Sequence, residues 1–221
     1  RFVFLDIYGY NLDMADLLLE IDRLKCEIDR LRPLNKGLMK TLSEKLRIEW
    51  TYNTNALEGN TLTLGETAFF LREGLTSEGK PLKDYLEAKN HVEALDGLED
   101  VIARKRPITE SLIKELHGVL MRDVRFTRAK NRDGKLINKP LHAGRYKSQP
   151  NHVLTLSGKI HQYCDPLHVQ DEMEELLKWS QKKIHPVLKA AHFHYRMVAI
   201  HPFDDGNGRL ARILMNLILI K

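Results

Sequence analysis

The sequence has few cysteines and no long hydrophobic run. Cys26 and Cys164 are its only cysteines among 221 residues, and two cysteines at this spacing form neither a disulfide framework nor a metal-ligand pattern. A reducing, cytoplasmic setting is therefore expected. The longest apolar run, from Ile213 to Ile220, is interrupted by Asn216 and is much shorter than the roughly 20 residues of a membrane span. We therefore expect a buried helix there and no membrane partner.

Two nucleotide-binding architectures are excluded by missing patterns. The sequence has no G-x-x-x-x-G-K-[ST] motif, so it is not a P-loop protein. Strand patterns do not alternate with helix patterns, which argues against a Rossmann sheet. No signal peptide is apparent, although a chain that begins with Arg1 rather than methionine can have lost one.

Positive charge is concentrated in one segment. The whole chain has a net charge of +5, whereas residues 122–147 carry nine Lys or Arg against Asp123 and Asp133, so that the remainder sums to −2. Such a field attracts phosphates, nucleic acid or an acidic protein, but it also fits a solvated loop. The nine cations are Arg122, Arg125, Arg128, Lys130, Arg132, Lys135, Lys139, Arg145 and Lys147.

The first helix predicted by periodicity carries an apolar stripe. Leu17, Ile21, Leu24, Ile28 and Leu31 recur at alternating spacings of four and three residues, which places them on one helix face. Two heptads are too few to predict a coiled coil. We therefore expect this helix to pack either on the body of the protein or on a second subunit, which allows a homodimer.

The rest of the chain is mainly helical in pattern. A helix over residues 38–52 is expected to be interrupted or recapped at Asn53-Thr54-Asn55 and to stop at Gly59-Asn60. Residues 127–150 predict a loop, and Ser157-Gly158 predicts the turn of the one β-hairpin in the chain. The sequence thus predicts an all-α helical bundle with one exposed hairpin. Other helices are expected over 81–104, 109–121, 171–183, 187–200 and 208–221.

The most informative segment runs from His201 to Arg212 and has the sequence HPFDDGNGRLAR. Its centre, Gly206-Asn207-Gly208, leads directly into an apolar helix. Helix N-termini present unpaired N–H groups and the positive end of the helix dipole, and glycines let a phosphate approach the backbone closely. The segment therefore predicts an anion site.

Charged and titratable side chains flank this loop. Arg209 and Arg212 are three residues apart and share one side of the helix, where guanidinium groups suit bidentate phosphate contacts. Asp205 is an oxygen ligand suited to a magnesium ion that bridges phosphates. His201 is the group here that accepts a proton near neutral pH. Together they predict phosphoryl or nucleotidyl transfer.

The same segment matches H-x-F-x-[DE]-G-N-G-R-x-x-R at all eight specified positions, and the chain therefore resembles the Fic family of AMP-transferases over roughly residues 54–221. The resemblance implies a Fic-type helical bundle. It also implies transfer of AMP from ATP to a Ser, Thr or Tyr hydroxyl of a target protein, with attack on the α-phosphorus and pyrophosphate leaving.

The resemblance assigns a role to each residue of the signature. His201 would be the base that deprotonates the target hydroxyl, Phe203 would anchor the loop, and Asp205 would hold Mg²⁺ on the ATP phosphates. Asp204, which the signature leaves unspecified, is expected to tolerate replacement. The implied nucleotide-binding residues are Asp205, Gly206, Asn207, Gly208, Arg209, Leu210, Ala211 and Arg212.

Two further segments resemble parts of the family. The hairpin after Gly144-Arg145-Tyr146 resembles the flap that pins the target segment, which would comprise Leu156, Ser157, Gly158, Lys159 and Ile160. Thr54, Glu58 and Gly59 match the pattern [ST]-x-x-x-E-[GN]. In relatives with this pattern upstream of the core, the glutamate pairs with the second signature arginine, here Arg212, and blocks ATP docking. An exposed helix glutamate is the alternative interpretation of so short a pattern.

These expectations define an organisation and its alternatives. Residues 1–63 would form a helical regulatory segment, and residues 64–221 a catalytic core that is shortened at its C-terminus relative to the family, whose members continue with residues that help to hold adenine. Removal of AMP, with Glu58 positioning water, is a second enzymatic hypothesis. A non-catalytic basic module that binds nucleic acid or an acidic protein through residues 122–147 is a third, although nucleic acid is not expected in the core.

Overall fold

The computed structural model describes residues 4–5, 11–130, 135–154 and 157–221. The chain divides into two compact units, residues 1–45 and residues 46–221. The predicted regulatory segment, residues 1–63, therefore covers the smaller unit and the beginning of the larger one.

The smaller unit contains a short antiparallel strand pair, β1 (Phe4–Leu5) and β2 (Asn11–Leu12), followed by helix α1 (Met14–Arg30). The carboxylate of Asp13 caps α1 by accepting the N–H of Ala15, as N-cap aspartates do. The helix predicted from the apolar stripe is thus confirmed. None of its residues is buried.

Helix α2 (Lys36–Ala56) begins in the smaller unit and ends in the larger one. The predicted interruption at Asn53-Thr54-Asn55 was wrong, because the helix continues through these residues. Thr54 and Asn55 are buried there, and tertiary packing overrides their weak helix propensity. The predicted stop is confirmed: Gly59 has φ +87°, and the N–H of Asn60 reaches back to the carbonyl of Asn55, as in a Schellman motif.

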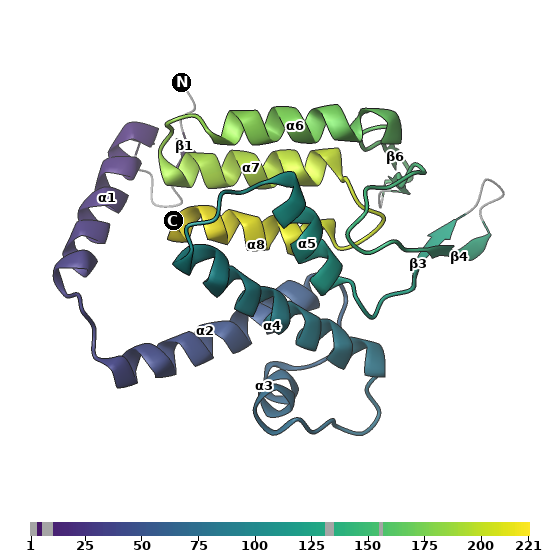
Figure 1. Cartoon of the computed structure of the whole chain (residues 1–221), viewed down its shortest axis with the longest axis horizontal. Helices are drawn as coiled ribbons and strands as arrows, with labels where there is room; N and C mark the ends of the chain where they lie inside the picture. Colours follow the sequence, from purple (N-terminus) through teal and green to yellow (C-terminus); the bar gives the residue numbers. More distant parts are fainter. Residues whose placement is uncertain (1–3, 6–10, 131–134, 155–156) are drawn as a thin grey trace. The chain divides into compact units, whose positions relative to one another are not determined.

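The larger unit is a helical bundle around α8 (Figure 1). The side chains of Leu210, Ile213, Leu214 and Leu217 on α8 are fully buried, and α4, α5 and α7 all contact this helix. The predicted all-α class is confirmed. The bundle helices are α4 (Leu82–Ala103), α5 (Glu110–Leu120), α6 (Val169–Ser180), α7 (Pro186–Ile200) and α8 (Asn207–Ile220), with a 3₁₀ turn, η1 (Pro166–His168), before α6.

Helix α3 (Leu64–Glu73) was not predicted, although its signal is present in the sequence. Thr63 and Glu66 form a capping box: the Thr63 hydroxyl accepts the N–H of Glu66 at 3.1 Å, and the Glu66 carboxylate accepts the N–H of Thr63 at 2.8 Å. Gly74, with φ +71°, ends the helix. A Thr followed three residues later by Glu indicates a helix start.

The region predicted to be a loop contains a β-hairpin. Strands β3 (Phe126–Lys130) and β4 (Leu136–Pro140) pair antiparallel, with Thr127 opposite Lys139. The loop prediction was therefore wrong for these residues. The sequence between the strands contains Asp133-Gly134, which lies outside the described residues but is a hairpin signal. The hairpin predicted around Ser157-Gly158 is confirmed by β5 (Val153–Leu154) and β6 (Ile160–His161).

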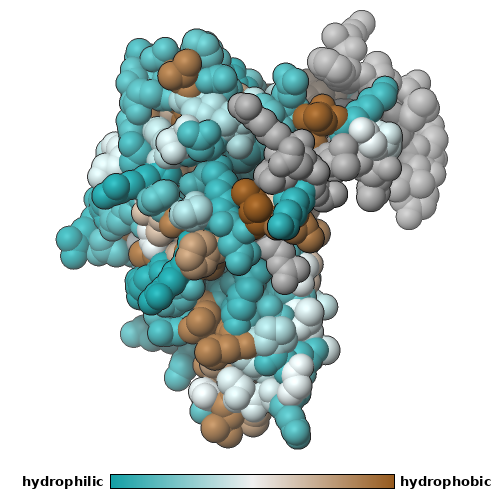
Figure 2. Space-filling model, turned by 90° about the vertical axis from the view of Figure 1, so that its right-hand side faces the viewer, coloured by the Kyte–Doolittle hydropathy of each residue, from teal (hydrophilic) through white to brown (hydrophobic). Residues whose placement is uncertain are grey.

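Apolar side chains are sparse on the face drawn in Figure 2. Hydrophilic residues cover most of it, and hydrophobic residues form small separate groups. In the larger unit, exposed apolar side chains include Phe69, Leu75, Phe126, Leu136 and Ile137. Within the described part of the chain, no helix combines the length and the hydropathy of a membrane span. Apolar burial is thus concentrated around α8.

Candidate functional site

The signature segment forms a tight loop between α7 and α8. His201 ends α7 in a left-handed conformation, with φ +52°, and Gly206 precedes α8 with φ +74°. A Cβ at Gly206 would lie 2.6 Å from the sulfur of Met121, so this close approach requires glycine. The loop therefore directs the N-terminus of α8 into the site, where helix N–H groups can bind an anion.

Buried contacts around Phe203 hold the loop in this shape. The side-chain oxygen of Asn207 accepts the Phe203 N–H at 2.9 Å, and its nitrogen donates to the Phe203 carbonyl at 2.8 Å. The Phe203 ring is fully buried and stacks on the ring of His117, with 3.8 Å between the ring centroids. Its centroid lies 5.3 Å from that of the Tyr146 ring. The predicted phosphate contact of the Asn207 side chain stays a prediction, since both of its polar atoms bind Phe203 here.

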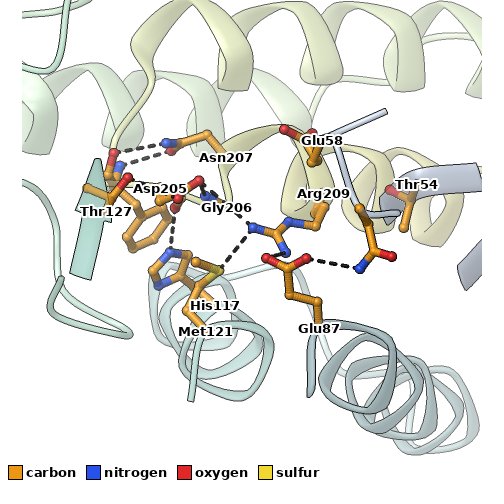
Figure 3. Close-up of polar contacts among 12 residues, drawn as sticks. Thr54, Glu58, Glu87, His117, Met121, Thr127, Asp205, Gly206, Asn207 and Arg209 are labelled. Atoms are coloured by element: carbon orange, nitrogen blue, oxygen red, sulfur yellow. Dashed lines mark hydrogen bonds and ion pairs between the residues drawn. The ribbon is translucent and has the colours of Figure 1, made fainter. Parts of the chain in front are cut away.

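His117 on α5 is a site residue that the sequence analysis missed. Its Nδ1 accepts the N–H of Gly144 at 2.8 Å, so the proton is on Nε2, which donates to the Asp205 carbonyl at 2.9 Å (Figure 3). Burial lowers the pKa of His117 to about 4, and the ring is neutral at pH 7. Its only signal in the sequence is its place on the buried face of α5, beside Ile113 and Leu120.

One cross-strand pair of the β3–β4 hairpin contacts both aspartates of the loop. The hydroxyl of Thr127 donates to Asp205 at 3.2 Å, and the Lys139 ammonium lies 2.7 Å from the carboxylate of Asp204. The Asp204 side chain is only 6% exposed, whereas that of Asp205 is 38% exposed. The two neighbouring carboxylates thus differ: Asp204 braces the loop, and Asp205 faces the open site.

Arg209 is buried, although it was predicted to bind phosphate. Its Nη1 lies 3.4 Å from a Glu87 carboxylate oxygen, and its Nη2 lies 3.8 Å from Asp205 and 3.6 Å from the sulfur of Met121 (Figure 3). Among the described residues, Nε and Nη1 have no hydrogen-bond partner. Glu87 on α4, which also binds Asn60 at 3.1 Å, was missed because nothing in its sequence context distinguishes it.

The structure brings Thr54 and Glu58 to Arg212. The Arg212 Nε donates to the Thr54 hydroxyl at 2.7 Å, and Nη2 donates to the Thr54 carbonyl at 3.2 Å and to the Glu58 carboxylate at 2.6 Å. The Glu58 carboxylate also lies over Gly208, where an added Cβ would be 2.5 Å from its oxygen. Glu58 therefore places a negative charge on the first turn of α8. Gly59 forms the turn that ends the α2 segment behind it.

The remaining two predicted nucleotide-binding residues have a different environment. The side chains of Leu210 and Ala211 are fully buried in the core, and the N–H of Leu210 donates to the carbonyl of Gly206. A nucleotide at this helix N-terminus would meet the backbone of the turn rather than these side chains.

His201 is held as a neutral imidazole. Burial is the main cause that lowers its pKa to about 3, the charge of Lys147 lowers it further, and Asp205 opposes both. Its Nδ1 is buried and has no hydrogen-bond partner in the described part of the chain. The ring of Tyr163 meets His201 edge-on at 3.8 Å. A neutral ring can accept a proton, and added negative charge nearby would raise its pKa.

The predicted flap lies beside this histidine. Ser157, Gly158, Lys159 and Ile160 are exposed, and Gly158 has φ +78°, whereas Leu156 lies outside the described residues. After β6, the His161 ring lies 4.8 Å from the ring of Tyr163, and Tyr163 in turn contacts His201. The hairpin is therefore linked to the site through one aromatic side chain.

Comparisons with known proteins agree with this architecture. The model of the Fic/DOC family matches residues 107–219, just over half of the chain. The chain is similar to protein adenylyltransferase fic-1 of Caenorhabditis elegans, with 29% identity over 93% of this chain and 37% of that protein. It is also similar to protein adenylyltransferase Fic of Nematostella vectensis, with 31% identity over 91% and 44%. The chain thus spans less than half the length of these relatives.

Solved structures share the fold. A Fic domain containing signaling protein from Bacteroides thetaiotaomicron matches with a TM-score of 0.78 and 37% identity, over 90% of this chain and 71% of that chain. Fic-1 from Caenorhabditis elegans matches with a TM-score of 0.72 and 25% identity, over 93% of this chain and 57% of that chain.

The contacts of His117 predict a stability effect. His117→Phe keeps an aromatic ring on Phe203 but leaves the Gly144 N–H and the Asp205 carbonyl without their partner. Because a buried unpaired polar group costs about 1–3 kcal/mol, we expect the urea midpoint of unfolding to fall markedly. His117→Gln, whose amide can bind one of the two groups, should lose less. An unchanged midpoint in the Phe variant would show that the two hydrogen bonds add nothing to stability.

Proposed function

Because the chain belongs to the Fic/DOC family, we propose that it transfers AMP from ATP to a Ser, Thr or Tyr hydroxyl of a target protein. One observation carries the proposal: a neutral histidine, a helix N-terminus lined by glycines and two arginines converge on one loop. Relatives similar over more than nine tenths of the chain are named protein adenylyltransferase, which supports AMP as the transferred group. A reducing, cytoplasmic setting remains a prediction from the sequence.

His201 is the base of the proposed reaction. The hydroxyl oxygen of the target forms a bond to the α-phosphorus, the bond to the bridging oxygen breaks, and pyrophosphate leaves. The hydroxyl proton moves to Nε2 of His201, because Nδ1 is buried. With a pKa of about 3, His201 by itself is a weak base. The negative triphosphate raises this pKa when it binds. ATP binding thus makes His201 a better proton acceptor.

The nucleotide phosphates would lie at the N-terminus of α8. The backbone around Gly206 and Gly208 offers room and N–H groups. The buried Arg209 holds two polar nitrogens that lack a hydrogen-bond partner among the described residues, and Arg212 becomes a phosphate ligand once Glu58 leaves it. Charge-assisted bonds of this kind are worth roughly 1.5–3 kcal/mol each.

Magnesium fits the site only as a companion of the nucleotide. In the described ranges no three His, Cys, Asp or Glu side chains gather to hold a metal ion. The partly exposed carboxylate of Asp205 lies beside the anion site, and Mg²⁺ is often bound by one or two carboxylates together with substrate phosphates. When bound there, the ion would neutralise phosphate charge. Asp205 is its proposed protein ligand.

Glu58 is the proposed inhibitor of this site. Its carboxylate contacts Arg212 at 2.6 Å and lies against Gly208. It therefore engages an arginine proposed to bind phosphate and fills the space proposed for the phosphates. A negative charge near the C-terminal end of α2 is unfavourable by itself, and Arg212 stabilises it. Removal of AMP, with Glu58 orienting water, is the alternative reaction that the activity measurements below distinguish.

The structure gives less support to a basic binding module. Arg122 pairs with Glu93 at 2.7 Å, and Lys139 pairs with Asp204. Lys147 is only 3% exposed, and burial lowers its pKa to about 8. Arg132 lies outside the described residues. Lys139 and Lys147 are thus enclosed in internal contacts, and Arg122 is paired at the surface.

ATP labelled at the α-phosphate tests the proposed reaction. With Glu58→Gly as the parent, label should appear on protein, whereas γ-labelled ATP should leave none. His201→Ala in that parent should lower transfer by about 10²–10⁴-fold, the usual contribution of a positioned base, while nucleotide binding measured by calorimetry persists. Undiminished transfer without His201 would show that another group takes the proton. Transfer from the γ position would identify a kinase, and release of AMP from a modified target would identify the reverse activity.

Replacing the two aspartates should have different consequences. Asp205→Ala should abolish transfer at every magnesium concentration and should lower the urea midpoint less than Asp204→Ala, because the Asp205 side chain is 38% exposed and that of Asp204 is 6% exposed. Asp204→Ala removes the partner of Lys139, so we expect a loss of about 1–3 kcal/mol of stability, whereas the folded variant should keep its transfer activity, as the signature predicts. Equal loss of transfer in two equally stable variants would mean that the roles of the carboxylates are misassigned.

Replacing Glu58 should raise the activity. Glu58→Gly removes the carboxylate, frees Arg212 and empties the space over Gly208, so self-modification at saturating ATP should increase severalfold. Glu58→Gln keeps the shape without the charge and separates the electrostatic part. Thr54→Val is the matched control, because it removes one hydrogen bond to Arg212 and leaves the charge of Glu58 in place. If Thr54→Val activates as strongly as Glu58→Gly, release of Arg212 rather than loss of the carboxylate relieves the inhibition.

A further inference from the structure

A short segment between β4 and β5, from Lys147 to Asn151, lies against the loop that carries the proposed base. Both of its ends donate hydrogen bonds to that loop. The Lys147 ammonium lies 3.4 Å from the carbonyl of Ile200, and the Lys147 N–H donates to the carbonyl of Pro202 at 2.8 Å. The side-chain amide of Asn151 donates to the carbonyl of Phe203 at 2.8 Å. The segment thus holds the backbone on both sides of the base.

Lys147 is placed there at a cost in free energy. Its side chain is buried, and its ammonium donates to the side-chain oxygen of Asn151 at 2.7 Å as well as to the Ile200 carbonyl. Both of these oxygens are neutral, and burial lowers the pKa of Lys147 to about 8. Burying a charged group is unfavourable unless its hydrogen bonds are satisfied. A lysine that served only solubility would extend into water, so the contacts of this one within the loop indicate a role there.

His201 needs support from its surroundings. Its backbone has φ +52°, a strained conformation for a residue with a side chain, which persists only where neighbouring contacts fix it. A functional histidine is often oriented by a hydrogen bond from its second ring nitrogen to a carbonyl or a carboxylate. Among the described residues, Nδ1 of His201 has no such partner. Its orientation is therefore set by the backbone on either side and by the edge-on ring of Tyr163.

We propose that Lys147 and Asn151 are positioning residues of this site, which hold His201 in the orientation that accepts the proton of the target hydroxyl. The inference rests on the proposed transfer of AMP, because it assigns these residues no chemistry of their own. The charge of Lys147 also lowers the pKa of His201, an effect that Asp205 opposes and His161 reinforces, and it thereby favours the neutral ring. Lys147 thus acts on the base rather than on an external anion.

Transfer from α-labelled ATP in the Glu58→Gly parent tests the proposal. Lys147→Met keeps the apolar stem and the bond of the backbone N–H but removes the ammonium, and Asn151→Ala removes the bond to Phe203. In both variants kcat for self-modification should fall by about 10–100-fold, because a misplaced base loses part of its contribution. The KM for ATP should stay nearly unchanged, since the bonds that are removed lie beside the base and not at the N-terminus of α8.

Lys139→Met is the matched control. The Lys139 ammonium binds Asp204 in the same loop, so this variant removes a largely enclosed lysine without touching the carbonyls beside the base, and kcat should be kept. Urea midpoints show that each variant is folded at the assay temperature. If kcat in Lys147→Met and Asn151→Ala equals that of the parent, or falls no further than in the control, the positioning role is wrong. A parent that transfers no label would instead refute the proposed function.

The orientation of His201 can be measured without turnover. The ring of Tyr163 lies 3.8 Å from the His201 ring, so the chemical shifts of the His201 ring protons depend on how the two rings are arranged. These NMR signals, identified by their loss in His201→Ala, should move in Lys147→Met and Asn151→Ala and stay in place in Lys139→Met. Signals that stay in place in all three variants would show that the segment does not orient the ring, whether or not the protein transfers AMP.

Discussion

The geometry of the site depends on the burial of Phe203. The loop has to hold a left-handed conformation at His201, which a residue with a side chain adopts only where surrounding contacts fix it. Phe203 supplies that anchor: its ring stacks on His117, and its backbone is held by the amide of Asn207. His117 then fixes the carbonyl of Asp205. The apolar core is thereby connected to the loop that carries His201 and Asp205.

Arg212 connects the site to its proposed regulation. Its guanidinium hydrogen-bonds both Thr54 and Glu58, and it lies one helix turn from Gly208 on α8. The arginine that would stabilise a phosphate tail therefore stabilises a carboxylate in its absence. Because a buried or half-buried charge needs a partner, Arg212 gains one in the resting form as well as in the nucleotide complex. The same residue thus favours two competing anions.

The sequence predicted the features set by neighbouring residues more fully than those set by packing between helices. The signature loop, the Gly59 stop and the apolar face of α8 follow from neighbouring residues, and the structure contains them. Glu87 and His117 could not be predicted in their roles, because an acidic residue and a histidine on a helix become site residues only through packing against α8. Thr54 and Asn55 led to the wrong prediction of a break in the helix, because burial outweighs their low helix propensity. The β3–β4 hairpin was missed because its charge hid the strand pattern.

Gly208 has a consequence for how the resting site responds to substrate. Its missing side chain makes room for an anion, and the space is filled by a carboxylate attached to the same chain. A tethered group acts as a ligand whose effective concentration is about millimolar or higher and does not fall on dilution. In the proposed inhibition, added nucleotide would compete with this tethered carboxylate, so raising the ATP concentration would be an inefficient way to open the site. Displacement of the end of α2 would lower the effective concentration of the carboxylate, so the proposal makes the position of a helix end, rather than the supply of substrate, the quantity that controls the site.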